Sequence, residues 1–361
     1  MTDSLLIQAQ AAARQFLQGR SITAVQPFGD GHINDTFMVT AASPEQKVVL
    51  QRINRNVFHH PDEVMENAVR VTRHIGRKIE AQRDGVRRET LRYLTAPDGS
   101  CCWADPAGGH WRAYHYIDRV VSYSIVSDAN ALTVSGRAFG TFMRQLADFP
   151  AETLHETIPR FHDTPNRYRN LHRALEADPL GRAGAVRAEI DFACAREPFA
   201  RRLVDALAQG VLPLRCTHND TKLNNVLLDE QTGQAVCVID LDTVMPGLAA
   251  YDFGDSIRFG ANPAAEDERD LSKVNFSVEY YEAYRKGYLE AAGDALTPAE
   301  LDSLLVGAKM MTLECGIRFL TDYLEGDTYF KTHRPGQNLD RTRTQFKLIA
   351  DMEALWPKEL L

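Results

Sequence analysis

The sequence lacks the features of secreted and membrane proteins. Its six cysteines have no regular spacing, and only Cys101 and Cys102 are adjacent, so they predict neither a disulfide framework nor a zinc site. No stretch reaches the roughly 18 apolar residues of a membrane helix. The N-terminal segment carries the acidic Asp3 and lacks the basic residues and apolar run of a signal peptide. We therefore expect a cytoplasmic protein with no membrane partner.

Positively charged residues are fewer than negatively charged ones. The formal net charge is −8 at pH 7, with 41 Lys and Arg residues against 49 Asp and Glu residues. Nucleic-acid binding needs a concentrated basic surface, and the arginine-rich segment 81–92 is more typical of a solvated turn. We therefore expect no nucleic-acid partner. The 361 residues, 44% of them hydrophobic, are enough for two domains with a sizeable core.

The pattern of apolar residues changes near residue 118. Before it, short β-rich runs are interrupted by one helix, which Pro61 and acidic residues open. The predicted elements there are strands over 22–28, 36–40, 47–53, 90–94 and 110–117, and a helix over 62–79. From about 128 onward helical spacing predominates, with a short island of strand-like runs. The predicted helices are near 129–148, 185–209, 267–291, 297–325 and 338–354. We predict an α+β protein with a β-rich domain over 1–117 and a helical domain over 118–361.

The loop "CTHNDTKLNNVLLD", 216–229, carries more side chains able to bind metal, protons or phosphate than a turn needs. His218, Asp220 and Asn225 follow the spacing H-x-D-x-x-x-x-N of kinase catalytic loops. In phosphoryl transfer an Asp accepts the proton of the attacking hydroxyl, and an Asn a few residues later holds Mg²⁺. Lys222 would then stabilise charge on the transferred group, and His218 would brace the loop.

A second signal follows at the end of the strand-like run "AVCVIDLDT". Asp240 lies 20 residues after Asp220 (240 − 220), and Asp242 lies two further on. Kinases place their second metal-binding aspartate at such a strand end. A single Asp there could also cap a turn, but the combination with the loop favours a phosphotransferase.

Two longer segments carry a family resemblance. "HNDTKLNNVLLD" followed by "VIDLDTVMPGLAAYDFGDSIR" resembles the aminoglycoside phosphotransferase and choline kinase superfamily. More narrowly, "GDGHINDTF", "VMENAVRVTRHI" and "RFLTDYLEGDTYF" resemble the anomeric N-acetylhexosamine 1-kinases. The resemblance implies a protein-kinase-like two-lobe fold, with a small mixed antiparallel sheet in the N-lobe and a larger, mainly helical C-lobe. It also implies ATP as co-substrate and Mg²⁺ as cofactor.

The resemblance assigns roles to individual residues. Asp220 matches the catalytic base, and Asn225 and Asp240 match the Mg²⁺ ligands, with Asp242 as a further candidate ligand. Asp252 matches a structural aspartate that follows the metal loop. The adenine would lie on a hinge at Tyr116 and Ile117.

The phosphate-binding side departs from the protein-kinase pattern. Gly29 and Gly31 have no third glycine, so G-x-G-x-x-G is not met, and a plain β-turn explains these glycines equally well. The strand "VVLQRIN" has no Lys. We expect Arg52 to replace it, with Glu66 or Glu63 on the following helix as its partner, although the same residues could form a surface salt bridge.

Two segments are predicted to bind the acceptor substrate. The loop holding His32 and Asn34 would face the sugar beside Asp220, and the C-terminal motif supplies Arg318, Tyr323 and Asp327. Sugars are bound by polar groups beside aromatic faces, which this mixture suits. Tyr323 could equally belong to a packed helix face.

We therefore expect a kinase that transfers the γ-phosphate of ATP to the anomeric hydroxyl of an N-acetylhexosamine such as GlcNAc or GalNAc. Its partners would be the small-molecule sugar and ATP, and the oligomeric state is left open. A kinase of another small alcohol, of the N-acetylmuramate, aminoglycoside, choline or homoserine type, is the alternative. A nucleotide-binding pseudokinase is a third, disfavoured by the intact Asp220, Asn225 and Asp240.

Overall fold

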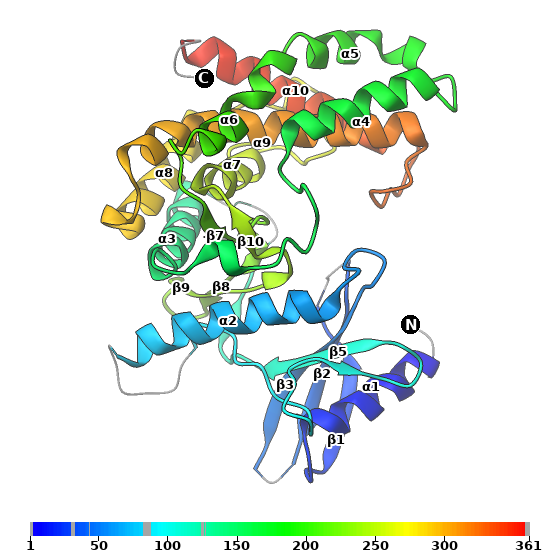
Figure 1. The fold of residues 1–361 in the computed structure, drawn as a ribbon, viewed down its shortest axis with the longest axis vertical. Helices are drawn as coiled ribbons and strands as arrows, with labels where there is room; N and C mark the ends of the chain where they lie inside the picture. Colours follow the sequence, from blue (N-terminus) through cyan, green and yellow to red (C-terminus); the bar gives the residue numbers. More distant parts are fainter. Residues whose placement is uncertain are drawn as a thin grey trace. The chain divides into compact units, whose positions relative to one another are not determined.

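The computed structural model describes residues 3–29, 33–42, 44–81, 88–123, 126 and 128–357. The chain forms two compact units (Figure 1). The first unit comprises Met1–Val121, Leu154–Ile158 and Leu227–Met245. The second comprises Ser122–Thr153, Pro159–Val226 and Pro246–Leu361. The predicted α+β class is confirmed, because an antiparallel sheet forms in the N-terminal region and the C-terminal part is helical.

The first unit is built on a five-stranded antiparallel sheet of order β1-β2-β3-β5-β4. Its strands are β1 (Ile22–Pro27), β2 (Asp35–Ala41), β3 (Gln46–Ile53), β4 (Trp103–Ala104) and β5 (His110–His115). A second sheet has the order β6-β8-β9. Its strands are β6 (Val120–Val121), β8 (Val226–Asp229) and β9 (Ala235–Val238). The helices of this unit are α1 (Asp3–Phe16) and α2 (Pro61–Glu80).

The larger sheet has two different faces because side chains alternate along each strand. On one face, Phe37, Leu50 and Trp111 are fully buried in a core completed by α1; we call it the α1 face. The intervening residues Gln51 and Arg112 point to the opposite face. There the Arg112 guanidinium lies 3.8 Å from the sulfur of Met65 in α2; we call it the α2 face.

Within the first unit, helix α2 contacts two segments that are distant from it in the sequence. Pro61 lies at its start, acidic residues occupy its first turn and basic residues its last, as the helix dipole favours. The side-chain amide of Asn67, 1% exposed, donates to the carbonyls of His155 at 2.8 Å and Val244 at 3.0 Å. The segments 154–158 and 227–245 therefore belong structurally with the N-terminal sheet.

The second unit is mainly helical. Its short sheet pairs β7 (Arg215–Thr217) with β10 (Met245–Gly247). Its helices are α3 (Ala129–Gln145), α4 (Thr164–Ala177), α5 (Arg187–Cys194), α6 (Arg202–Ala208), α7 (Ala249–Gly260), α8 (Val278–Ala292), α9 (Pro298–Glu325) and α10 (Gln337–Leu355). The long helix α9 opens with a capping box of Thr297 and Glu300. Figure 1 shows α4 and α10 packed along α9.

Helices α7 and α9 approach each other through glycine. A Cβ on Gly307 would lie 2.1 Å from the carbonyl oxygen of Ala250, and one on Gly254 would lie 2.3 Å from that of Gly307. Both contacts are with backbone, which cannot move aside as a side chain can. This contact fixes α7, the helix that holds the loop after β7.

No helix within the described ranges combines the length and the apolar character needed to cross a membrane.

Candidate functional site

Helix α7 fixes the backbone of the loop that follows β7. The Asp252 carboxylate accepts hydrogen bonds from the backbone N–H groups of His218 and Asn219, both at 2.8 Å. Asn219 has a positive φ of 63°, a conformation that few residues other than glycine adopt. Burial raises the pKa of Asp252 to about 6, even though His218 and these two donors lower it. The predicted structural role of Asp252 thus has a geometric basis.

Asp255, one helical turn after Asp252, holds the next part of the loop. Its carboxylate accepts from the backbone N–H of Thr221 at 3.0 Å and from Nε of Arg258 at 3.0 Å. The Ser256 hydroxyl donates to the Thr221 carbonyl at 2.8 Å. The sequence reasoning missed Asp255, although the spacing D-x-x-D on a helix places both carboxylates on one face.

His218 is fully buried and serves as a brace. Its ring lies edge-to-face between Phe139 and Phe142 of α3, with ring centroids 5.6 and 5.8 Å away. Its Nδ1 lies 3.3 Å from the backbone nitrogen of Asp220, so Nδ1 is the acceptor and the loop is pinned at that point.

The Asp220 side chain is held by two partners. Lys222 Nζ lies 2.7 Å from Oδ1, and Asn225 Nδ2 donates to Oδ2 at 3.1 Å and to the backbone carbonyl of Asp220 at 2.8 Å. Burial alone would raise the pKa of Asp220, but Lys222, His218 and Asn225 outweigh it, so this pKa lies below its usual value. Asp220 in turn raises the pKa of Lys222. The pair is therefore a carboxylate and an ammonium at neutral pH.

The predicted metal-binding aspartate lies in the first unit. Asp240 follows β9 with a positive φ of 61°, and a one-turn helix over Leu241–Thr243 comes next. The Asp242 carboxylate, 4% exposed, already has a partner at each oxygen: Arg112 at Oδ1 and the Asn34 amide at Oδ2, 2.6 Å away. A metal that bound Asp242 directly would have to share these oxygens with Arg112 and Asn34.

The donor atoms fit Mg²⁺. Among the described residues, no group of three or more His, Cys, Asp or Glu is arranged around a common metal position. Magnesium in kinases needs fewer, because one or two protein oxygens, phosphates and water complete its octahedron. Asn225 uses its Nδ2 for Asp220, which leaves its Oδ1 as a possible ligand. An amide oxygen from Asn225 and a carboxylate from Asp240 are the hard oxygen donors that Mg²⁺ prefers.

The expected hinge residues follow β5. Tyr116 donates its backbone N–H to the carbonyl of Lys47 at 3.2 Å, and its ring meets Phe28 edge-to-face at 5.9 Å. Ile117 is 8% exposed. Gly31 and His32, the predicted nucleotide and sugar contacts of the preceding loop, lie outside the described residues.

The partner expected for Arg52 is wrong. Arg52 forms its ion pair with Asp35 at 2.9 Å and also donates to Gln8 of α1 at 3.2 Å. Glu66 instead bonds His155 at 2.9 Å. The reason is strand alternation: residue 52 points to the α1 face, whereas α2 covers the other face. Its role toward a nucleotide stays a prediction.

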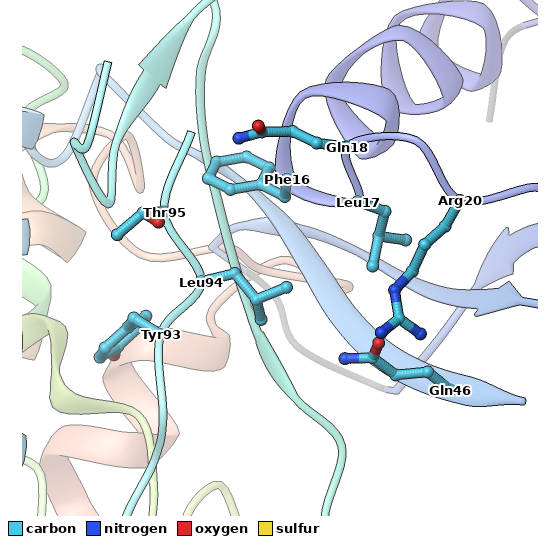
Figure 2. Close-up of a pocket in the computed structure, with 8 residues that line it drawn as sticks. All are labelled: Phe16, Leu17, Gln18, Arg20, Gln46, Tyr93, Leu94 and Thr95. Atoms are coloured by element: carbon cyan, nitrogen blue, oxygen red, sulfur yellow. The ribbon is translucent and has the colours of Figure 1, made fainter. Parts of the chain in front are cut away.

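A shallow pocket of about 390 Å³ lies in the first unit (Figure 2). Figure 2 shows the side chains of Arg20 and Gln46 extending toward each other at its rim. The lining residues are Phe16, Leu17, Gln18, Arg20, Gln46, Tyr93, Leu94 and Thr95. They include none of the predicted site residues.

In the second unit, Arg318 lies among aromatic rings. Its guanidinium carbon is 5.3 Å from the ring centroid of Phe330, 5.4 Å from that of Phe161 and 5.9 Å from that of Tyr329. Asp322 is not its partner. The Asp322 carboxylate binds the backbone N–H groups of residues 328–330 at 2.7–2.9 Å, which holds this aromatic segment in place.

Tyr323 and Asp327 form a separate cluster. Arg182 stacks over the Tyr323 ring at 4.6 Å and bonds the Asp327 carboxylate at 2.7 Å. Asn338 also donates to Asp327 at 3.0 Å. These contacts support the packing interpretation that the sequence left open for Tyr323, while a sugar-binding role for either residue stays a prediction.

Glu314, one turn before Arg318, is fully buried. It bonds His162 Nδ1 at 2.9 Å and the Thr164 hydroxyl at 2.7 Å. Burial alone would raise its pKa, but His162, Arg167 and Arg318 outweigh it and lower the pKa to about 2. This acid was missed because a single Glu within an apolar helix gives no sequence signal of its partners.

Glu314→Gln should make the protein less acid-sensitive. A carboxylate whose pKa is lowered on folding stabilises the protein above its ordinary pKa near 4.5, and this contribution is lost as the pH falls toward 2. At pH 7 the variant should lose about 3–5 kcal/mol of unfolding free energy, and the loss should shrink at pH 3. Urea unfolding at both pH values checks this. Glu290→Gln, at an exposed pair with Arg137, is the matched control. An equal loss at both pH values would contradict the assignment.

Known proteins share this sequence pattern and fold. A family model described as "Phosphotransferase enzyme family" matches residues 24–301. A microcompartment-associated aminopropanol kinase is 18% identical, with a TM-score of 0.58 and coverage of 96% of each chain. Spectinomycin phosphotransferase, solved with ADP and spectinomycin, is 12% identical, with a TM-score of 0.55 and coverage of 100% of this chain and 99% of that one. A choline/ethanolamine kinase family protein from Mesorhizobium loti is 16% identical, with a TM-score of 0.54 and coverage of 98% and 96%. The expected kinase-like fold is thereby confirmed.

Proposed function

The chain belongs to the phosphotransferase enzyme family and is a phosphotransferase with an alcohol group as acceptor, and from this premise we propose that it is a sugar 1-kinase. The reaction transfers the γ-phosphate of ATP to the anomeric hydroxyl of an N-acetylhexosamine and yields the sugar 1-phosphate and ADP.

One observation carries the proposal. The Asp220 carboxylate lies between Lys222 and Asn225 on a loop whose backbone is fastened by Asp252 and Asp255. Such fixed geometry is what phosphoryl transfer requires, because positioning and electrostatics supply most of its catalysis.

Each residue then has a task. Asp220 orients the acceptor hydroxyl and receives its proton late in the transfer, and its lowered pKa keeps it ionised for this. The anomeric hydroxyl is more acidic than other sugar hydroxyls, so a weak carboxylate base suffices. Lys222, 2.7 Å from Asp220, stabilises charge on the transferred group. Asn225 and Asp240 are the residues that the sequence predicts would hold Mg²⁺, which would supply neutralisation of the phosphate charge.

The first unit would receive the nucleotide. The adenine would lie along the hinge residues Tyr116 and Ile117, where the edge-to-face contact with Phe28 gives an aromatic surface. Its phosphates would approach the loop that contains Gly31.

The surroundings of Arg318 support a neutral, hydroxyl-rich acceptor. A guanidinium donates several hydrogen bonds, and the neighbouring Phe161, Tyr329 and Phe330 offer apolar faces for a sugar ring. A choline-type site would need these rings for a quaternary ammonium. Here a cation of the protein already lies among them, which disfavours choline and the polycationic aminoglycosides. His32 stays a candidate contact from sequence alone.

The deciding experiment is a substrate panel. The purified protein is incubated with Mg²⁺, ATP and single acceptors: GlcNAc, GalNAc, N-acetylmuramate, choline, homoserine and an aminoglycoside. ³¹P NMR distinguishes an anomeric phosphate from other phosphate esters. We expect an anomeric phosphate with an N-acetylhexosamine. Product from another acceptor only would replace the sugar assignment, and ATP binding without product from any acceptor would favour a pseudokinase.

Arg318→Ala should raise the KM for the sugar by about tenfold or more, since a lost charged hydrogen bond costs roughly 1.5–3 kcal/mol. The KM for ATP should stay nearly constant. Steady-state kinetics and the melting temperature are measured together.

Arg196→Ala is the matched control for this prediction. Arg196 also stacks on an aromatic ring in the second unit, but its partners are Phe192 and Glu353. An unchanged sugar KM in a well-folded Arg318→Ala protein would remove Arg318 from the acceptor site.

A further inference from the structure

Strand β3 carries a lysine, Lys47, near its start and a glutamine, Gln51, near its end. In protein kinases a lysine of the third strand pairs with a glutamate of the next helix. Here β3 carries Gln51 on the α2 face. The direct cross-strand neighbour of Gln51 on β5 is Arg112. Positive charge beside Gln51 is therefore supplied by the adjacent strand.

Arg112 is 2% exposed and belongs to a continuous chain of hydrogen bonds. Its Nε donates to the Gln51 side chain at 2.9 Å, and Gln51 donates to the Thr36 hydroxyl at 3.1 Å. Its Nη1 donates to Asp242 Oδ1. All these groups lie within the first unit.

Asn34 completes the chain on the other side of Asp242. Its Nδ2 donates to Asp242 Oδ2 at 2.6 Å, and its Oδ1 accepts from the backbone N–H of Asn54 at 3.0 Å. The carboxylate is thus fixed from both the β5 and the β2–β3 side. Burial alone would lower the pKa of Arg112, but Asp242 outweighs it and raises the pKa, so Arg112 stays charged.

This buried pair acts next to the predicted metal ligand. Asp242 is two residues after Asp240, whose backbone adopts the left-handed conformation that few non-glycine residues tolerate. A strained residue persists only when its surroundings hold it. The contacts of Asp242, together with the bond of Asn67 to the Val244 carbonyl, supply that support.

We propose that Arg112 is a positioning residue for the Mg²⁺-nucleotide site: its ion pair with Asp242 replaces the lysine–glutamate pair of protein kinases and orients Asp240. This inference rests on the proposed kinase function. It gives Asp242 a supporting role, not that of a ligand, and leaves a direct phosphate contact of Arg52 as a separate prediction.

The test is calorimetric and needs no turnover. Mg·ADP and Mg²⁺-free ADP are titrated into the parent protein and into Arg112→Met, Arg112→Lys and Arg88→Met. Arg88 also pairs with an aspartate of the first unit, Asp229 at 3.0 Å, and is the matched control. Melting temperatures report folding.

Arg112→Met should bind Mg·ADP about 10- to 100-fold more weakly, the usual loss when the support of a metal ligand is removed. Its affinity for Mg²⁺-free ADP should change much less. Arg112→Lys, which keeps the charge but not the forked geometry, should be intermediate. Arg88→Met should leave both affinities unchanged.

Asn34→Ala provides the second variant in case Arg112→Met does not fold. It removes the bond to Asp242 Oδ2 but leaves the ion pair, and it should weaken Mg·ADP selectively by several-fold. A folded Arg112→Met or Asn34→Ala protein with the parent's preference for Mg·ADP would overturn the inference. So would a larger selective loss in Arg52→Met. A parent that binds neither form of ADP would overturn the proposed function itself.

Discussion

Asp220→Asn is expected to lower kcat by about 10² to 10⁴, the usual value of a positioned proton acceptor. The amide keeps the size of the carboxylate, and the anchors of the loop at Asp252 and Asp255 do not depend on residue 220. The nucleotide should therefore bind as before. Single-turnover kinetics with ATP, together with ADP titration, separate the two effects.

Thr232→Ala, in a turn after β8, is the control, because this residue lies outside the candidate site. Its turnover and its melting temperature should match those of the parent. Turnover by Asp220→Asn within a few-fold of the parent would exclude Asp220 as the base. Equal losses of turnover and ADP affinity would instead indicate a disturbed loop, which the melting temperature would reveal.

Asp240→Ala is expected to abolish measurable activity at ordinary Mg²⁺ concentrations. The metal would lose its carboxylate ligand, and Lys222 alone cannot neutralise the charge on two phosphates. Raising the Mg²⁺ concentration should restore activity only poorly. The measurement is a Mg²⁺ titration of activity for the variant and the parent.

Asp229→Ala is the matched control, because Asp229 is also an aspartate at the end of a strand of the same sheet but pairs with Arg88. If the Mg²⁺ titrations of Asp240→Ala and the parent coincide, Asp240 is a structural residue.

The N-terminal strands and the helix after Pro61 could be predicted because their signals are local. Alternation and β-branched residues mark β1, β2 and β3, and Pro61 with its acidic neighbours marks the start of α2. Residues 90–94 were predicted as a strand, yet only Tyr93 forms a bridge, to Tyr114. The predicted helix 185–209 is broken into α5 and α6 around Pro198, whose ring cannot continue a helix interior.

Helix α7 escaped prediction for a different reason. Nearly all of its residues are buried, so its polar face, which carries Asp252, Asp255 and Ser256, does not mark a solvent-exposed side. Its buried acids, Asp252 and Asp255, compensate by binding backbone N–H groups of a distant loop. The polar residues inside this apolar segment therefore bind the backbone of a loop and are not exposed to solvent.

The candidate site also has a part that could be predicted from local sequence and a part that could not. The spacing of His218, Asp220 and Asn225 is contained in eight consecutive residues, so a sequence displays it. The partner of Arg52 and the network of Arg112 depend on which face of a sheet each strand position occupies, and on a residue 130 positions away. Such relations require the register of the folded sheet.

The discontinuous first unit also has a consequence for synthesis. At roughly 5–20 residues per second on the ribosome, the 130 residues that follow Arg112, up to and including Asp242, take on the order of ten seconds to appear. Until then the guanidinium on the α2 face has no carboxylate partner, and burying it unpaired is costly. We therefore expect the α2 face around Arg112 to stay incompletely packed until Asp242 emerges, which is after helices α3 to α6 of the second unit. A chaperone that covers the α2 face would act in that interval.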